Sequence, residues 1–237
     1  MASDKPKVAV VTGGSQGIGA GIVAAYRDQG WSVVANALHL EPSKDPQLLT
    51  VAGDISDPAT ASQIFDQALS HFGRVDTLVN NAGVFVSKPF TDYTADDYAL
   101  MIGVNLTGFF YAAQRAIAEM LKTGGGHIVN LTTVIVDYAH STEPSALTSL
   151  TKGGLAAVTK SLAVEYATRG IRVNAIAPGV IRTPMHPADS YAASARLAPM
   201  GRVGEISDIV NGILYLESSP FVTGETLHID GGQIAGH

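Results

Sequence analysis

The chain has 237 residues, of which 46% are apolar and 15% charged, so it does not belong to the disordered proteins, which combine low hydrophobicity with high net charge. A formal net charge of −6 argues against a nucleic-acid-binding protein, and the lack of cysteine excludes disulfide scaffolds, thiolate nucleophiles and cysteine zinc sites. The first residues hold no apolar stretch typical of a signal peptide, and no apolar run approaches the roughly 18 residues of a membrane helix. We therefore expect a cytoplasmic protein that binds neither membrane nor nucleic acid.

Strand-like and helix-like segments alternate along the whole chain. Short β-branched runs predict seven strands, at residues 7–12, 31–36, 49–52, 75–80, 127–132, 171–177 and 226–230. Helical spacing bounded by glycine or proline predicts helices at residues 17–29, 58–72, 95–122, 145–169 and 205–217. This alternation predicts right-handed βαβ units, and hence an α/β fold with a doubly wound parallel sheet. We expect a single domain over residues 1–237, in which about residues 180–200 form a substrate lid.

A glycine-rich turn follows the first predicted strand directly. It reads Thr12-Gly13-Gly14-Ser15-Gln16-Gly17-Ile18-Gly19 and opens the first predicted helix. Glycines at these places allow a tight turn and let a pyrophosphate approach backbone N–H groups at the positive end of a helix. The sequence therefore indicates a dinucleotide site, with a tight turn that binds no ligand as the alternative.

Further motifs follow in order along the chain. They are Asp54-Ile55, Asn80-Asn81-Ala82-Gly83, Asn105, Lys152, Pro178-Gly179-x-Ile181-x-Thr183, Phe221-Val222-Thr223-Gly224 and Asp230-Gly231-Gly232. Together with the glycine-rich turn, they resemble the motifs of the short-chain dehydrogenase/reductase family over about residues 7–233. The resemblance implies a Rossmann-like fold, hydride transfer with NAD or NADP, and a homotetramer or homodimer built on the long helices 95–122 and 145–169.

The resemblance also assigns the cofactor contacts. They are Gly13, Ser15, Gln16, Gly17, Ile18, Gly19, Asn36, Asp54, Ile55, Asn81, Ala82, Gly83, Lys152, Pro178, Gly179, Ile181 and Thr183. Residues 35–39 end the second strand without an acidic residue for the ribose 2′-hydroxyl of NAD, and without an arginine for NADP. Asn36, His39 and Lys44 could reach a 2′-phosphate. The sequence leaves both cofactors open and favours NADP slightly.

The family's catalytic pair, Tyr-x-x-x-Lys on one helix face, is altered in this chain. Lys152 matches the lysine, but the tyrosine position is Thr148. A phenol titrates near 10, and an adjacent ammonium lowers that pKa, whereas a threonine hydroxyl does not titrate in a useful range. A positioned acid is worth about 10²–10⁴ in rate, so ordinary ketone reduction needs another proton donor. Thr133 stands at the family's serine position, and its hydroxyl can still bond a substrate oxygen.

Several groups are candidates for the proton donor that would replace the tyrosine. The interval between Thr133 and Thr148 is longer than is usual in the family, and it contains Tyr138, His140 and Glu143. Each is a replacement acid or, alternatively, a solvent-facing loop residue. A water is a further candidate, because Asn105 and Lys152 match the family's proton relay. The histidines show no metal-ligand spacing, so we expect no metal site.

Three kinds of function are compatible with these residues. The first is an NAD(P)-dependent oxidoreductase with an atypical proton donor, acting on a small carbonyl or alcohol, an imine or a conjugated alkene. The second is a catalytically impaired dinucleotide sensor or partner subunit, which Thr148 favours. The third is a non-redox enzyme, such as a lyase or epimerase, on the same fold.

Overall fold

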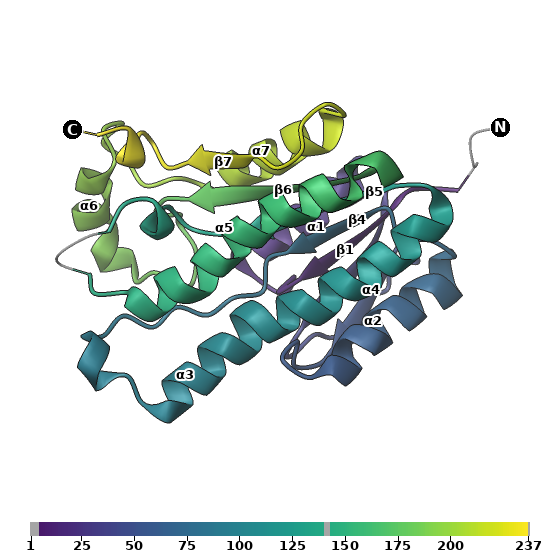
Figure 1. The fold of residues 1–237 in the computed structure, drawn as a ribbon, viewed down its shortest axis with the longest axis horizontal. Helices are drawn as coiled ribbons and strands as arrows, with labels where there is room; N and C mark the ends of the chain where they lie inside the picture. Colours follow the sequence, from purple (N-terminus) through teal and green to yellow (C-terminus); the bar gives the residue numbers. More distant parts are fainter. Residues whose placement is uncertain (1–4, 140–142, 237) are drawn as a thin grey trace.

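The computed structural model describes residues 5–139 and 143–236. Seven parallel strands form one sheet in the order β3-β2-β1-β4-β5-β6-β7 (Figure 1). The strands are β1 (Val8–Thr12), β2 (Ser32–Ala37), β3 (Leu48–Ala52), β4 (Thr77–Asn80), β5 (Gly126–Leu131), β6 (Ile171–Pro178) and β7 (Thr226–Ile229). The strand order reverses between β1 and β4, which is where doubly wound sheets bind their ligands. The predicted Rossmann-like fold is confirmed.

Helices cover both faces of the sheet. They are α1 (Gly17–Asp28), α2 (Pro58–Phe72), α3 (Ala95–Ile102), α4 (Gly108–Thr123), α5 (Ala146–Tyr166), α6 (Tyr191–Ser194) and α7 (Ile206–Ser218). Helices α2, α4 and α5 pack on one face, and α1 and α7 pack on the other (Figure 1). Within the described part of the chain, no helix combines the length and apolarity needed to cross a membrane.

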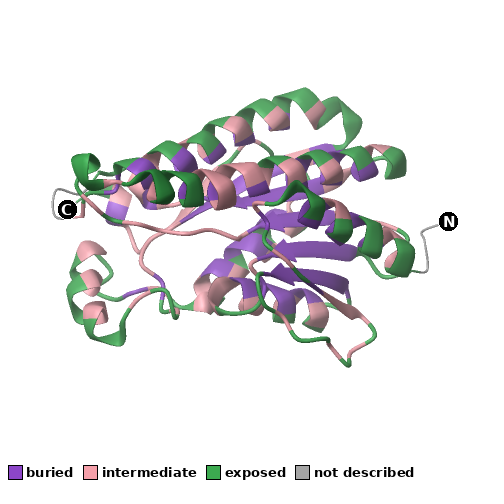
Figure 2. Ribbon diagram, turned by 90° about the horizontal axis from the view of Figure 1, so that it is seen from below, coloured by how far each residue is buried: buried purple, intermediate pink, exposed green. Residues whose placement is uncertain are grey.

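Strand β1 shows how the sequence produces the two layers of core. Val8 and Val10 belong to the apolar core beneath α2, α4 and α5, whereas Ala9 and Val11 belong to the core beneath α1 and α7. Successive side chains of a strand point to opposite faces, so a continuous apolar run fits only a strand covered on both sides. Figure 2 shows the sheet buried and the outer faces of the helices exposed.

The long helix predicted at 95–122 is interrupted. A π-helical turn at Gly103–Thr107 separates α3 from α4. Gly103 and Gly108 let this turn approach the loop after β3, because a Cβ on Gly108 would lie 2.9 Å from Ile55 and one on Gly103 would lie 3.2 Å from Ser56. Side-chain periodicity does not distinguish a π turn from α-helix, so the sequence did not predict it. Such turns are frequent at functional sites, and this one carries Asn105.

The predicted lid segment contains short helical turns. These are Ala188–Ser190, α6 and Ala195–Leu197. The Tyr191 hydroxyl donates to the backbone oxygens of Thr183 and His186 at 3.2 and 3.1 Å, and the Arg182 guanidinium lies 4.5 Å from the centre of the Tyr191 ring. Tyr191 therefore holds the lid segment to the residues that follow β6.

A buried polar cluster lies at the amino ends of β4 and β5, opposite the glycine-rich turn. Glu217 Oε2 accepts hydrogen bonds from His127 Nδ1 at 2.9 Å, Thr77 Oγ1 at 3.0 Å and Tyr26 Oη at 3.2 Å. Asn174 Nδ2 lies 3.1 Å from His127 Nε2, so that nitrogen is the acceptor and the ring is neutral. Burial lowers the pKa of His127, against the opposing effect of Glu217. Burial raises the pKa of Glu217, but the hydrogen bonds from His127, Thr77 and Tyr26 outweigh it and lower the pKa overall.

This cluster predicts a loss of stability in mild acid. Because the folded state depresses the pKa of His127, the unfolded chain binds the proton first, and stability falls as the pH drops below about 6.5. The slope has an upper limit of about 1.4 kcal/mol per pH unit for one proton. The His127→Gln variant keeps a donor and an acceptor but does not titrate, so its unfolding free energy in urea should vary less between about pH 5 and 7. Equal slopes in the two proteins would refute this role of His127.

Candidate active site

The glycine-rich turn is folded so tightly that side chains are excluded from it. Gly13 and Gly17 have φ angles of 66° and 55°, in the left-handed region that favours glycine. A Cβ on Gly19 would overlap the Gly13 carbonyl oxygen and lie 2.6 Å from Asn81 Nδ2. Gln16 precedes α1 without a side-chain cap, so the first N–H groups of α1 have no partner from a capping side chain. The turn thus combines close backbone access with the positive end of a helix.

Asn81 and Thr12 bind this turn to the segment after β4. Asn81 Nδ2 donates to the backbone oxygens of Thr12 at 2.9 Å and Gly13 at 3.0 Å. Thr12 Oγ1 accepts from the backbone nitrogens of Asn81 and Ala82 at 3.1 and 3.0 Å. The structure therefore brings together four of the residues expected at a dinucleotide: Gly13, Gly19, Asn81 and Ala82.

The remaining predicted cofactor residues lie around the same edge of the sheet. Thr183 packs beside Gly17, since a Cβ on Gly17 would lie 3.5 Å from Thr183 Cβ. Pro178 ends β6, and the Gly179 nitrogen donates to the Ile229 oxygen at 3.0 Å. Three further predicted residues, Ser15, Gln16 and Ile18, belong to the turn and the first residues of α1, where Ser15 and Gln16 are exposed.

Four predicted cofactor residues have structural partners of their own. Asn36 is buried, and its Nδ2 donates to the backbone oxygens of Val51 and Gly53 at 3.0 and 3.1 Å, so it joins β2 to the end of β3. Ile55 is buried against Gly108 at the start of α4. Asp54 Oδ1 accepts from the Ser56 nitrogen at 2.9 Å. Ile181 is buried in a parallel bridge with Gly204, beyond the end of β6.

Lys152 and Asn105 converge on Gly83, directly after Ala82. A Cβ on Gly83 would lie 3.0 Å from Lys152 Nζ and 3.4 Å from Asn105 Oδ1. Asn105 Oδ1 accepts from the Val84 nitrogen at 2.9 Å, while its Nδ2 donates to the Val84 oxygen at 3.0 Å. Its Nδ2 also donates to Thr151 Oγ1 at 3.2 Å. The π turn and α5 are thereby joined at the carboxyl edge of the sheet.

Lys152 is buried beside uncharged groups. Its Nζ donates to the Leu131 oxygen at the end of β5, at 2.7 Å. Burial lowers the pKa of Lys152 to about 8, because an ammonium is less stable away from water. This pKa leaves the side chain mostly charged at neutral pH but able to release a proton.

Thr148 lies one helical turn before Lys152 on α5. Its side chain is buried, with 3% of the residue exposed. Its Oγ1 has no hydrogen-bond partner among the described protein atoms. A buried hydroxyl without a partner is unfavourable by about 1–3 kcal/mol.

The other candidate groups lie in the segment between β5 and α5. Thr133 follows β5, and its Oγ1 accepts from the Ile135 nitrogen at 3.4 Å. Tyr138 is 41% exposed, unlike Thr148 and Lys152. The carbonyl of Glu143 accepts from the Ser145 hydroxyl at 2.8 Å. His140 lies outside the described residues.

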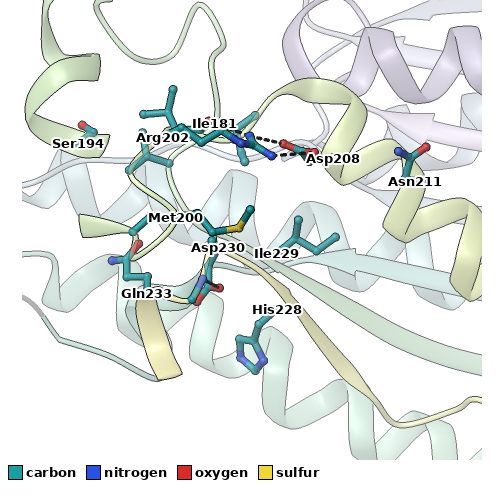
Figure 3. Close-up of a pocket in the computed structure, with 16 residues that line it drawn as sticks. Ile181, Ser194, Met200, Arg202, Asp208, Asn211, His228, Ile229, Asp230 and Gln233 are labelled. Atoms are coloured by element: carbon teal, nitrogen blue, oxygen red, sulfur yellow. Dashed lines mark hydrogen bonds and ion pairs between the residues drawn. The ribbon is translucent and has the colours of Figure 1, made fainter. Parts of the chain in front are cut away.

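A cavity of about 480 Å³ lies at the outer edge of the sheet, between β7, α7 and the end of the lid segment (Figure 3). Its lining includes Ile181 but neither Thr148 nor Lys152. The Arg202–Asp208 ion pair lies along one wall. Asp230 accepts from the Gly232 and Ile234 nitrogens at 2.9 Å each, so this motif residue fixes the turn after β7. The cavity is therefore separate from the residues that converge on Gly83.

Known proteins resemble this chain over most of its length. A family model described as "Enoyl-(Acyl carrier protein) reductase" matches residues 13–233. The 3beta-hydroxysteroid dehydrogenase 1 of Eggerthella lenta is 38% identical, over 96% of this chain and 94% of that protein. A short-chain type dehydrogenase/reductase from Mycobacterium marinum superposes with a TM-score of 0.91 at 30% identity, over 97% of this chain and 96% of that one. The chain belongs to the short-chain dehydrogenase/reductase family.

Two solved structures similar to this chain hold a nicotinamide dinucleotide. One is ElxO with NADP bound, with a TM-score of 0.91 and 29% identity over 98% of this chain and all 100% of that one. The other is the 3-ketoacyl-(acyl-carrier-protein) reductase of Brucella melitensis complexed with NADH, with a TM-score of 0.88 and 29% identity over 97% of this chain and 99% of that one. Membership of this dehydrogenase/reductase family identifies the chain as a probable oxidoreductase.

Sequence reasoning missed three groups that shape this site. They are the Leu131 carbonyl, the Val84 backbone and Thr151, which hold Lys152 and Asn105 in place. Backbone partners leave no mark in a sequence. Thr151 lies three residues after Thr148, on the same side of α5, and that spacing is the one signal that could have identified it.

Proposed function

We propose that the protein transfers a hydride between NAD(P)H and a small carbonyl or alcohol, an imine or a conjugated alkene, at the site where Lys152 and Asn105 meet Gly83. The observation that carries this proposal is that the glycine-rich turn is hydrogen-bonded to the segment that leads to Gly83. The side-chain-free turn of Gly13, Gly17 and Gly19 is bonded through Asn81 to the segment that leads to Gly83. These contacts support a shared site for the cofactor and for Lys152, the residue that matches the family's catalytic lysine.

The residues around that edge fit a dinucleotide. By resemblance to the family, the glycine-rich turn would hold the pyrophosphate, Asp54 and Ile55 the adenine, and Pro178, Gly179 and Thr183 the nicotinamide, which supplies the hydride. Lys152 would bind the nicotinamide ribose. The shape of the glycine-rich turn supports this assignment, because a Cβ at Gly19 or Gly13 would fill the space beside its backbone.

The choice between NADP and NAD depends on the end of β2. Residues 35–39 contain no carboxylate that would repel a 2′-phosphate, and His39 is exposed there. The amide hydrogens of Asn36 are both engaged with β3, so Asn36 offers no free donor to a phosphate. The similar structures hold NADP in one case and NADH in the other. We therefore propose that the protein uses NADP or NAD, and we favour NADP slightly.

The exposed apolar side chains of the long helices support self-association as a homotetramer or homodimer. Tyr98, Leu100, Phe110, Leu150 and Val164 are all about half or more exposed on α3, α4 and α5. Exposed apolar groups of this size on neighbouring helices favour burial against another protein surface. Light scattering of the purified protein tests this, and a monomer at micromolar concentration would refute it.

The function is tested by cofactor binding followed by turnover. NADPH and NADH are titrated by fluorescence, and oxidation of the bound cofactor is then followed with ketones, imines and enones. We expect tight binding and turnover with at least one substrate class. Tight binding with no turnover in any class would favour the sensor or partner-subunit alternative, for which Thr148 is the supporting residue. Failure to bind either cofactor would refute the proposal.

A further inference from the structure

Resting on the proposed function, we propose that Tyr191 is a positioning residue for the nicotinamide half of the cofactor. Its side chain comes from the lid segment and fixes a turn of residues 183–186, which lies between β6 and α6. Thr183 is the residue of this turn that the family resemblance assigns to the nicotinamide. Tyr191 therefore acts on the cofactor through Thr183.

The first observation is the place of Thr183 in the fold. A Cβ on Gly17 would lie 3.5 Å from Thr183 Cβ, 3.6 Å from Thr183 Cγ2 and 3.8 Å from Pro184 Cδ. The first residues of the 183–186 turn therefore pack against the glycine-rich turn, at the point where α1 begins. A displacement of Thr183 would change the wall of the dinucleotide site, although Tyr191 itself belongs to the lid segment.

The second observation is how the 183–186 turn is held in shape. One backbone hydrogen bond closes the turn, from the His186 nitrogen to the Thr183 oxygen at 3.1 Å. The Tyr191 hydroxyl donates to the same Thr183 oxygen at 3.2 Å and to the His186 oxygen at 3.1 Å. A hydroxyl has one hydrogen, so the two carbonyl oxygens share it. The Tyr191 side chain thus joins both ends of the turn.

The third observation is that the ring of Tyr191 rests on a residue fixed to the body of the protein. The Arg182 guanidinium lies 4.5 Å from the centre of that ring. The Arg182 nitrogen donates to the Gly204 oxygen at 2.8 Å, which fixes its backbone. The Arg182 side chain also pairs with Glu205 at 3.0 Å, but both side chains are about half exposed, so this ion pair contributes little.

These contacts order the 183–186 turn in the protein without cofactor. When a loop must be ordered during binding, the ordering cost is subtracted from the binding free energy, and the affinity falls. Loss of one hydrogen bond of this kind corresponds to about a 3–10-fold change in affinity. The adenine half of the cofactor should be unaffected, because it is assigned to the loop after β3, and β3 is separated from β6 by four other strands.

The first test compares a whole cofactor with its adenine half. NADPH and NADH, and ADP-ribose with and without a 2′-phosphate, are titrated by calorimetry into the wild-type protein and the Tyr191→Phe variant, which keeps the ring and loses the hydroxyl. We expect Tyr191→Phe to bind the dinucleotide about 3–10-fold more weakly and ADP-ribose equally well. Equal dinucleotide affinity in the two proteins, or equal weakening for both kinds of ligand, would overturn the proposal.

The matched control is Tyr215→Phe. Tyr215 lies on α7 and is 54% exposed. Removal of its hydroxyl should leave the affinities for the dinucleotide and for ADP-ribose unchanged. A loss of dinucleotide affinity as large as that of Tyr191→Phe would mean that the effect is not specific to the lid, and would count against the role of Tyr191.

The second test asks whether Tyr191 acts through Thr183. The Thr183→Val variant keeps the shape of the side chain and removes its hydroxyl, so it should weaken dinucleotide binding by itself. In this background, Tyr191→Phe should cause little further loss, because the group that it positions is already missing. Losses that add in full in the double variant would show that the two residues act independently, which is contrary to the proposal.

The outcomes distinguish this proposal from the one on which it rests. If the wild-type protein binds the dinucleotide and transfers hydride, and Tyr191→Phe binds it equally well, the positioning role is wrong and hydride transfer stands. If Tyr191→Phe shows the expected loss but no substrate class is turned over, the positioning role stands and the proposed reaction is wrong. If the wild-type protein binds neither dinucleotide, both proposals are overturned.

Discussion

The Gly19→Ala variant is expected to lose measurable binding of NADPH and NADH, a weakening of at least about 10²-fold, or about 3 kcal/mol. Its new Cβ would overlap the Gly13 carbonyl oxygen and press on Asn81 Nδ2, the atom that ties the turn to the catalytic segment. The turn must then open, and the backbone N–H groups no longer converge on one phosphate. Fluorescence titration of both reduced cofactors measures the effect.

A second substitution covers the case in which Gly19→Ala does not fold. A Cβ on Gly17 would lie at an ordinary 3.5 Å from Thr183, so Gly17→Ala should fold, with a strain of about 1 kcal/mol from its positive φ. It should still weaken binding, because the methyl group stands at the start of α1. The control is Gly153→Ala in α5, where the nearest atom is 3.8 Å away, and where alanine should stabilise the helix by about 0.5–1 kcal/mol. Unchanged cofactor affinity in Gly17→Ala would contradict the assignment of the turn.

The Thr148→Tyr variant is expected to reduce ketones about 10²-fold faster than the wild-type protein. The substitution restores a phenol one helical turn from the Lys152 ammonium, whose charge favours the phenolate and brings the tyrosine pKa toward the working range. The pH dependence of kcat should change as well, because the new phenol titrates and the threonine hydroxyl does not. Steady-state kcat and kcat/KM over a pH series measure both effects.

The matched control is Thr148→Phe, which brings the same ring without the hydroxyl. It should gain no activity, because its ring has no hydroxyl to give a proton. Equal rates in the tyrosine and phenylalanine variants would show that any gain comes from packing. No gain from Thr148→Tyr would mean that the chain departs from the family in the segment 134–146 rather than in the missing acid alone.

The fold was predictable from the sequence because its signals are local and strong. The run 8–12 is apolar at every position except its last, which only a strand buried on both faces accommodates. Helix α2 begins at Pro58, as predicted, because Asp57 caps it, and it ends before Gly73, whose φ is 83°. Parallel pairing then follows, since each strand is joined to the next by a crossover.

The site was only partly predictable, because much of it depends on backbone groups brought together by the fold. Sequence motifs identify the glycine-rich turn, Asn105 and Lys152. The structure places these residues around one edge of the sheet. The π turn that aims Asn105 depends on the approach of Gly103 and Gly108 to the loop after β3. Likewise, Asn36 was expected at the cofactor, and its commitment to the carbonyls of Val51 and Gly53 has no trace in local sequence.

The unpaired state of Thr148 arises in the same way. The sequence shows that tyrosine is absent at this position, but not that the Ser87 hydroxyl donates to the Pro144 oxygen, the backbone oxygen four residues before Thr148. That the buried Thr148 hydroxyl has no hydrogen-bond partner among the described protein atoms appears only in the structure.

The central claim, that this protein transfers hydride without a tyrosine acid, is tested most directly by isotope transfer. NADPH or NADH deuterated at the transferable position of the nicotinamide is incubated with the wild-type protein and a panel of ketones, imines and enones, and the products are analysed by mass spectrometry. We predict that one deuterium appears on carbon in the product of at least one substrate class. Bound cofactor that passes no deuterium to any substrate would contradict the account and favour a sensor or partner subunit.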